Sequence, residues 1–140
     1  MSLIVYSTQI KIQLIKYNIK IIGGQSLKVV NLSKKTILCE KGSIANTFLK
    51  RLKGLMFQKN IQEKTGLLIK PCNSIHTFWM NFSIDVIFIS KDNKVVYIIE
   101  NLSPNKFSKV IRNSTSVLEL PVGTIKSTNT NIGDRLGIEA

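Results

Sequence analysis

The amino-acid sequence predicts a compact, mainly β protein: a sandwich or barrel-like sheet of antiparallel or mixed strands with one short helix packed on it. Three observations support this prediction. Short apolar runs recur along the chain, turn residues such as Gly, Asn and Ser separate them, and only one stretch repeats its apolar residues every three to four positions. We therefore expect about seven to nine short strands and a single helix that covers part of the sheet.

The length of 140 residues and the 44% of hydrophobic residues suit one domain with its own core. We expect residues 27–140 to form a single β domain and residues 1–25 to form an N-terminal β-like extension. In the extension, Ile and Leu alternate with polar residues over 10–14 and again over 15–21, with a slip of one residue between the runs. An amphipathic helix on a membrane surface is the alternative for this segment.

The first elements of the domain are a hairpin and the helix. Residues 27–32 and 36–40 predict two short strands around the turn Ser33-Lys34-Lys35. At 45–57, helical spacing connects five apolar residues, namely Phe48, Leu49, Leu52, Leu55 and Met56. Asn46 or Ser43 would cap this helix, and Gly54 would loosen its last turn or contact another backbone closely. Residues 66–70 then predict a strand that ends at Pro71.

Residues 71–100 hold the only His, the only Trp and the longest strongly apolar run. They predict three strands, at 74–80, 84–89 and 94–100, joined by two tight turns. The strand at 84–89 is apolar on both faces, which indicates that both faces are covered. The pair Asp92-Asn93 suits a type I′ turn, in which both central residues have positive φ.

Pairing the strands at 74–80 and 84–88 would place His76 opposite Phe88 and Asp85 opposite Trp79, on different sheet faces. After this stretch, residues 102–113 predict a loop. Residues 116–121 and 135–140 predict the last two strands, with turn residues between them.

The net charge of +12 raises the question of a polyanion partner. Only three of the 20 basic residues are Arg, and the basic residues are spread along the chain, so we favour solvated surface lysines over a binding surface, and nucleic acid is the less favoured partner. No uncharged apolar run reaches the ~18 residues of a transmembrane helix, and no signal peptide is recognisable. With Cys39 and Cys72 as reduced thiols, these features favour the cytoplasm.

Candidate catalytic residues are His76, Asp85, Cys72 and Glu119, and candidate ligand-binding residues are Arg51, His76, Trp79 and Asp85. Each also has a structural interpretation. His76 has apolar neighbours, and Trp79 is more typical of a core residue. Asp85 would accept hydrogen bonds from the amides of the preceding turn or pair with Arg51. A pair of Cys72 and His76 would need a bend at Asn73, because four strand residues span more than ~10 Å.

Cys72 and His76 supply at most two metal ligands where structural zinc needs four, so no metal is expected. The sequence contains no phosphate-binding loop or nucleotide fingerprint, and we expect no cofactor.

Four segments, in this order, closely resemble the uncharacterised bacterial and archaeal domain-of-unknown-function 192 family: RLKGLM (51–56), GLLIKPCNSIHTFWMNFSIDVIFI (66–89), VLELPVG (117–123) and GDRL (133–136). The chain resembles the branch with the string SIHTF-x-M-x-F-x-IDV. The positions that match the family motif are Arg51, Gly54, Leu55, Met56, Pro71, Cys72, His76, Thr77, Met80, Asp85, Glu119, Gly123, Gly133 and Asp134. The resemblance covers about residues 27–140, and it implies a mainly β domain without an established activity.

The sequence therefore leaves the activity unknown and three hypotheses open. The first is a non-catalytic module that binds a small ligand or a protein through a rim of Arg51, His76, Trp79 and Asp85. The second is a small hydrolase that uses His76 with a nearby carboxylate or Cys72. The third is a basic module that binds polyanions.

Overall fold

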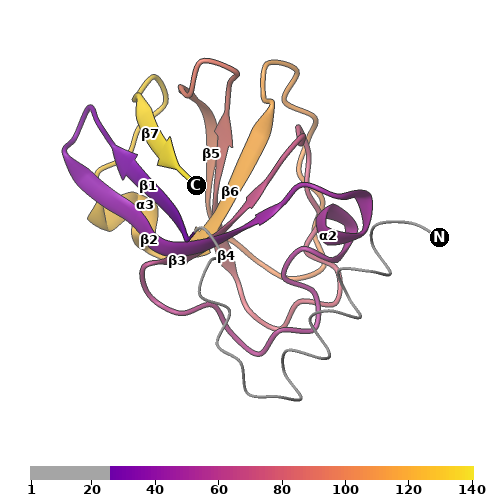
Figure 1. The fold of residues 1–140 in the computed structure, drawn as a ribbon. Helices are drawn as coiled ribbons and strands as arrows, with labels where there is room; N and C mark the ends of the chain where they lie inside the picture. Colours follow the sequence, from indigo (N-terminus) through magenta and orange to yellow (C-terminus); the bar gives the residue numbers. More distant parts are fainter. Residues whose placement is uncertain (1–25) are drawn as a thin grey trace, which may run out of the picture.

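Seven strands and two short helices form the part of the chain that the computed structural model describes, residues 26–140 (Figure 1). In chain order they are β1 (Leu27–Asn31), β2 (Thr36–Ala45), α2 (Phe48–Lys53), β3 (Thr65–Ile69), β4 (Ile84–Ile89), β5 (Val95–Leu102), β6 (Ser116–Pro121), α3 (Thr124–Ser127) and β7 (Leu136–Glu139). The predicted mainly β fold is confirmed. The predicted β-like extension at 1–25 lies outside the described residues and stays a prediction.

All seven strands belong to one mixed sheet in the order β5-β4-β6-β3-β2-β1-β7, in which only β2 and β3 are parallel. The sheet curls into a half-barrel, because its two outer strands approach each other at one end (Figure 1). There Val95 N–H donates to Asp134 O at 2.9 Å, and Leu136 N–H donates to Asn93 O at 2.8 Å. These bonds satisfy backbone groups that would otherwise lie at exposed sheet edges.

Apolar side chains pack on both faces of the curled sheet, and the strands alternate between the two cores. On β4, Ile87 and Ile89 belong to an inner core, which also holds Leu27 of β1, Leu136 of β7 and Ile125 of α3. An outer core lies between the sheet, α2 and the loops, and its buried residues are Ala45, Leu55, Leu67, Ile69, Ile75, Met80, Ile84, Val86, Phe88, Ile111 and Val117. All six residues of β4 are buried, which confirms the prediction of a strand covered on both sides.

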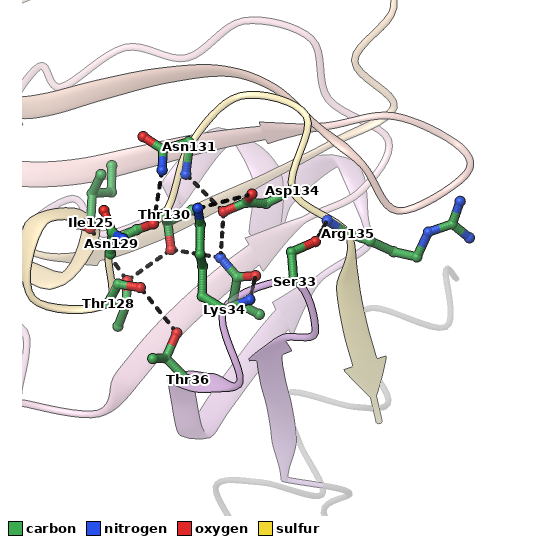
Figure 2. Close-up of polar contacts among 11 residues, drawn as sticks. Ser33, Lys34, Thr36, Ile125, Thr128, Asn129, Thr130, Asn131, Asp134 and Arg135 are labelled. Atoms are coloured by element: carbon green, nitrogen blue, oxygen red, sulfur yellow. Dashed lines mark hydrogen bonds and ion pairs between the residues drawn. The ribbon is translucent and has the colours of Figure 1, made fainter.

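A buried polar network ties the β1–β2 turn to the segment between α3 and β7 (Figure 2). Asn31 Nδ2 donates to Thr130 Oγ1 at 3.0 Å and to Asp134 Oδ2 at 2.8 Å. Burial alone would raise the pKa of Asp134, but hydrogen bonds from Asn31 and from Asn131 N–H, together with the Lys34 ammonium, outweigh it and lower this pKa. The network therefore holds these two segments together through satisfied polar groups rather than through apolar packing.

We expect Thr130→Val to lower the free energy of unfolding by about 1–2 kcal/mol, because the isosteric valine removes the hydroxyl that accepts from Asn31 and bonds to Thr128 Oγ1. Urea denaturation followed by circular dichroism measures the change. Thr115→Val is the matched control, since Thr115 is exposed and its hydroxyl makes only a 3.4 Å contact with Ile89 O. Equal effects of the two substitutions would contradict a stabilising role of the network.

The predicted strand at 74–80, and with it the hairpin to 84–88, is wrong. Trp79 has a φ of +58°, which interrupts an extended strand, and His76 instead forms an isolated bridge with Phe107. The partner of Asp85 on the neighbouring strand is Leu120, not Trp79. The segment from Pro71 to Ser83 is therefore a long loop over the outer core, held by the loop at 103–111.

The helix was predicted at 45–57 but spans only Phe48–Lys53, and none of its residues is buried. Its N-cap is Thr47, whose side chain accepts from Lys50 N–H, and not Asn46 or Ser43. Gly54 ends the helix with a φ of +46°, which favours glycine at this position. The sequence does not predict the second short helix, α3, because four residues are too few to show a helical period.

At the β4–β5 turn, only Asn93 has positive φ, so the predicted type I′ geometry, which needs two such residues, is absent. The other strand predictions are confirmed to within a few residues, apart from β2, which extends five residues beyond its predicted end to Ala45. No helix among the described residues is long and apolar enough to cross a membrane.

Candidate functional site

A cavity of about 300 Å³ lies beside α2, on the outer face of the sheet. Its walls come from α2 and the turn after it, from the end of β3, and from the loop at 71–76, and one residue of β6, Glu119, also lines it. The lining residues are Phe48, Arg51, Leu52, Lys53, Gly54, Leu55, Met56, Ile69, Pro71, Cys72, Asn73, Ser74, Ile75, His76, Met80 and Glu119. A cavity of this volume is at the lower end of the range for small-molecule sites.

The loop that carries His76 is fixed by hydrogen bonds to the loop at 103–111. Thr77 N–H donates to Lys106 O and Ser108 N–H donates to Ile75 O, both at 2.9 Å. The buried hydroxyl of Thr77 also donates to Ser103 O at 2.7 Å. His76 Nδ1 accepts from Phe78 N–H at 3.3 Å, so a neutral ring carries its proton on Nε2. His76 is thus held on a well-connected loop at the cavity wall.

Glu119 is the buried ionisable group of the cavity, with 2% of its surface exposed. Its neighbours on β6, Leu118 and Leu120, point into the inner core, so alternation turns Glu119 to the outer face. Glu119 Oε2 has no hydrogen-bond partner among the described residues. Burial raises the pKa of Glu119 to about 8, because the charged carboxylate loses its hydration. The cavity therefore contains a carboxyl group that is largely protonated at neutral pH.

Gly54 brings the backbone at the end of α2 close to this carboxyl group. A side chain at Gly54 would place its Cβ 4.0 Å from Glu119 Oε2 and 3.9 Å from Arg51 O. The predicted close contact with another backbone at Gly54 is therefore wrong: among the described residues its neighbours are a carbonyl of its own helix and a side-chain oxygen, both at ordinary contact distance. Arg51 lines the same space, and its Nη1 donates to Asn46 O at 3.5 Å, at the limit for a hydrogen bond. The described residues give it no carboxylate partner within 4 Å.

Cys72 lies in the cavity wall as a protonated thiol. Burial raises its pKa, a backbone hydrogen bond of Ser74 counteracts this, and the nearby Glu119 and Arg51 have smaller, opposing effects. Its Sγ donates to Ser74 O at 3.0 Å. A nucleophilic cysteine needs a lowered pKa and an adjacent base, so the environment of Cys72 does not favour nucleophilic catalysis.

Asp85 and Trp79 do not line the cavity. Asp85 is 1% exposed and lies on the inner side of the sheet, where Oδ1 accepts from Asn101 N–H and Oδ2 accepts from Ile125 N–H, both at 2.9 Å. Neither the turn before it nor Arg51 is its partner, so that expectation is wrong. Trp79 is 62% exposed rather than part of the core, because the turn at its position directs it outward.

The structure therefore brings together four of the candidate residues, Arg51, Cys72, His76 and Glu119, and separates Asp85 and Trp79 from them. Phe48 and Leu52 also line the cavity, although their spacing predicted a helix face packed on the sheet. The described residues contain no group of three or more His, Cys, Asp or Glu side chains that could hold a metal ion.

Comparison with known proteins gives a family and a fold. The model of the family DUF192, described as "Uncharacterized ACR", matches residues 29–138. A UPF0127 protein of Thermococcus sibiricus is 34% identical over 115 residues, 79% of this chain and 74% of its own length. A UPF0127 protein of Pyrococcus furiosus is 31% identical over 113 residues, 77% of this chain and 95% of its own length.

A crystal structure of a protein of unknown function from Novosphingobium aromaticivorans has the same fold, with a TM-score of 0.70 and 20% identity. The alignment covers 84% of this chain and 89% of that one. These matches confirm the resemblance seen in the sequence, and none of them names a substrate or a ligand.

Proposed function

This chain belongs to the DUF192 family, whose function is unknown, and we propose that it is a non-catalytic protein that binds a small ligand in the cavity beside α2. One observation carries the proposal: Glu119 Oε2 is buried at the cavity without a hydrogen-bond partner among residues 26–140. Leaving a buried polar atom unpaired costs about 1–3 kcal/mol. A ligand that donates a hydrogen bond to Glu119 would remove this cost.

The chemistry of the walls narrows the class of ligand. Leu52, Leu55 and Ile69 offer apolar contacts, while Glu119 and Arg51 offer an acceptor and a cation. A primary amine would donate to Glu119, and its charge would favour the ionised carboxylate. A second, anionic group on the same molecule would suit the guanidinium of Arg51. We therefore propose an amine with a short apolar body, and amino acids as the variant that uses both charged groups.

The contacts support binding better than hydrolysis. No hydrogen bond joins His76 to a carboxylate within the described residues, and the Nδ1 atom of His76 is occupied by Phe78 N–H. The Cys72 thiol is held in its protonated form by burial. General-base catalysis by His76 would be helped by a carboxylate that orients the ring, and nucleophilic catalysis by Cys72 would need a base that removes the thiol proton. For the setting of this binding we propose the cytoplasm, which the two separate thiols of Cys39 and Cys72 support.

A thermal-shift screen of small primary amines, amino alcohols and amino acids tests the proposal, because a ligand stabilises the state that it binds. We expect a hit to raise the melting temperature of the natural chain and of Glu100→Gln, but not of Glu119→Gln. Glu100 is the matched control, since it is an exposed glutamate on β5. A shift that survives in Glu119→Gln would contradict the proposed site.

The pH dependence gives a second measurement. An ammonium group prefers ionised Glu119, so its apparent affinity should rise up to about tenfold per pH unit below the pKa of about 8 and level off above it. Isothermal titration between pH 6 and 9 would measure this slope. Binding without such a slope, in a chain whose stability profile shows Glu119 to be protonated, would exclude the amine and favour a neutral hydroxyl donor as the ligand.

A further inference from the structure

The surface around the cavity mouth has an unusual combination of charge and exposed apolar side chains. It is formed by three segments, residues 45–60, 71–84 and 101–115, whose exposed side chains we call the loop face. Backbone hydrogen bonds join the segments: Phe57 N–H donates to Trp79 O at 3.3 Å, and Asn105 N–H donates to Thr77 O at 3.0 Å. The three segments therefore form one continuous surface.

The loop face exposes large apolar side chains. Of the 11 large hydrophobic residues that are exposed in residues 26–140, the first segment contributes Phe48, Leu49, Leu52 and Phe57. The other two segments contribute Trp79, Phe107 and Val110. The rings of Phe78 and Phe107 are 4.7 Å apart, and those of Phe78 and Trp79 are 6.0 Å apart. An apolar surface of this kind on a folded protein indicates an interaction site.

The charge on the loop face has a single sign. The three segments contain no Asp or Glu, although the chain has eight of them, and they carry seven basic residues: Lys50, Arg51, Lys53, Lys59, Lys106, Lys109 and Arg112. A second copy of this face would bring like charges together. Residues 1–25 carry Lys11, Lys16 and Lys20 and no acid, so their charge is equally unfavourable. The charge of the loop face therefore favours an anionic partner.

We propose that the loop face docks on the surface of an anionic lipid bilayer. In this arrangement Trp79, Phe57 and Phe107 insert among the headgroups, and the lysines lie above the inserted side chains. A bilayer accepts apolar and aromatic side chains together with basic ones. Binding to nucleic acid would not bury exposed aliphatic side chains such as those of Leu49 and Val110. Nucleic-acid recognition also favours Arg, whereas five of the seven basic residues of the loop face are Lys. This docking is independent of the ligand proposed for the cavity, although it would bring the cavity mouth to the membrane.

The only tryptophan of the chain reports on this surface directly. With the full chain at low salt, vesicles of phosphatidylcholine and phosphatidylglycerol should shift the Trp79 emission to shorter wavelength and carry the protein into the pellet. Vesicles of phosphatidylcholine alone should do so much less. No emission shift with the anionic vesicles would overturn the proposal.

Paired variants separate the apolar and electrostatic contributions. Phe57→Ser with Phe107→Ser should reduce vesicle partitioning about tenfold or more, since their side chains are 70% and 74% exposed and would insert. The matched control is Val122→Ser with Ile132→Ser, at exposed positions outside the loop face.

The electrostatic contribution is tested by Lys50→Gln with Lys106→Gln, which should reduce vesicle binding about fivefold or more. The matched control is Lys91→Gln with Lys126→Gln. Equal losses in a test pair and its control would contradict the docking surface.

The same fluorescence measurement identifies the other occupants, each of which would overturn the proposal. Emission that is already short-wavelength without vesicles and depends on protein concentration would assign the loop face to a second copy. The same emission without concentration dependence would show that the chain itself covers Trp79. A shift with polyglutamate but not with vesicles would indicate an acidic protein, and retention on heparin without any shift would indicate adsorption by charge alone.

Discussion

Asp85→Ala is expected to lower the free energy of unfolding by about 2–5 kcal/mol. This loss should be larger than that caused by replacing an exposed acidic residue. Asp85 joins three elements: it lies on β4, and its two oxygens accept from Asn101 N–H at the end of β5 and from Ile125 N–H in α3. Alanine removes both acceptors at once. The buried Ile125 N–H then lacks a partner, which costs about 1–3 kcal/mol, and the part-buried Asn101 N–H loses its acceptor as well.

Urea denaturation followed by circular dichroism measures this loss, with Asp92→Ala as the matched control. Asp92 lies exposed in the β4–β5 turn, so its replacement should change stability by about 0.5 kcal/mol or less. Asp85→Asn should fall between the two, because its amide nitrogen would face a backbone N–H while its oxygen still accepts. A loss in Asp85→Ala below about 1 kcal/mol would contradict the structural role and reopen a ligand-binding role for this carboxylate.

The stability of the ligand-free protein is expected to fall as the pH rises from 4.5 to about 8. In the folded state the pKa of Glu119 is about 8, against 4.5 for the ordinary side chain, so between these values the folded chain holds a proton that the unfolded chain releases. The contribution is complete below pH 4.5, decreases through this window and is constant above pH 8. Its total is at most about 5 kcal/mol, because each pKa unit is worth ~1.4 kcal/mol.

Glu119→Gln should remove this pH dependence, because glutamine keeps the shape of the side chain but does not titrate. Urea denaturation at several pH values from 5 to 8.5 would show a flatter profile for Glu119→Gln than for the natural chain, while Glu100→Gln keeps the natural slope. Asp134 does not contribute to the slope in this pH range, because its pKa is lowered from the ordinary value and so lies below the range. Parallel profiles of the natural chain and Glu119→Gln would show that Glu119 is ionised in the folded protein.

Local patterns predicted much of the sheet because they report on elements that need only their own residues. The apolar run IDVIFI corresponds to β4, and SVLELP corresponds to β6, at the predicted bounds. The helix was found but overextended, since Leu55 belongs to the outer core and continues the apolar spacing after Gly54 has ended the helix. Periodicity records which residues are covered, not whether the backbone remains helical.

The loop at 71–83 has the sequence pattern of a strand for a related reason. Ile75 and Met80 are buried in the outer core, so the segment shows the apolar content of a strand. Its partner is a distant loop, through Ser108 and Lys106, rather than the next strand. A contact between segments about 30 residues apart does not show in the spacing of apolar residues along the chain. The sequence therefore predicts the wrong hairpin, with Asp85 opposite Trp79, and does not place Glu119 at a site.

By itself, the sequence determined the family, the mainly β class, most strand positions and a set of ionisable residues in apolar surroundings, because these depend on local composition and spacing. Only the tertiary structure decided which of those residues share a site. Alternation along the two neighbouring strands turns Asp85 to the inner face, toward α3, and Glu119 to the outer face, toward the cavity beside α2, although both are acids in apolar strands. The reason is physical: a buried carboxyl group acquires its role from the donors that surround it, and these come from segments far away in the chain.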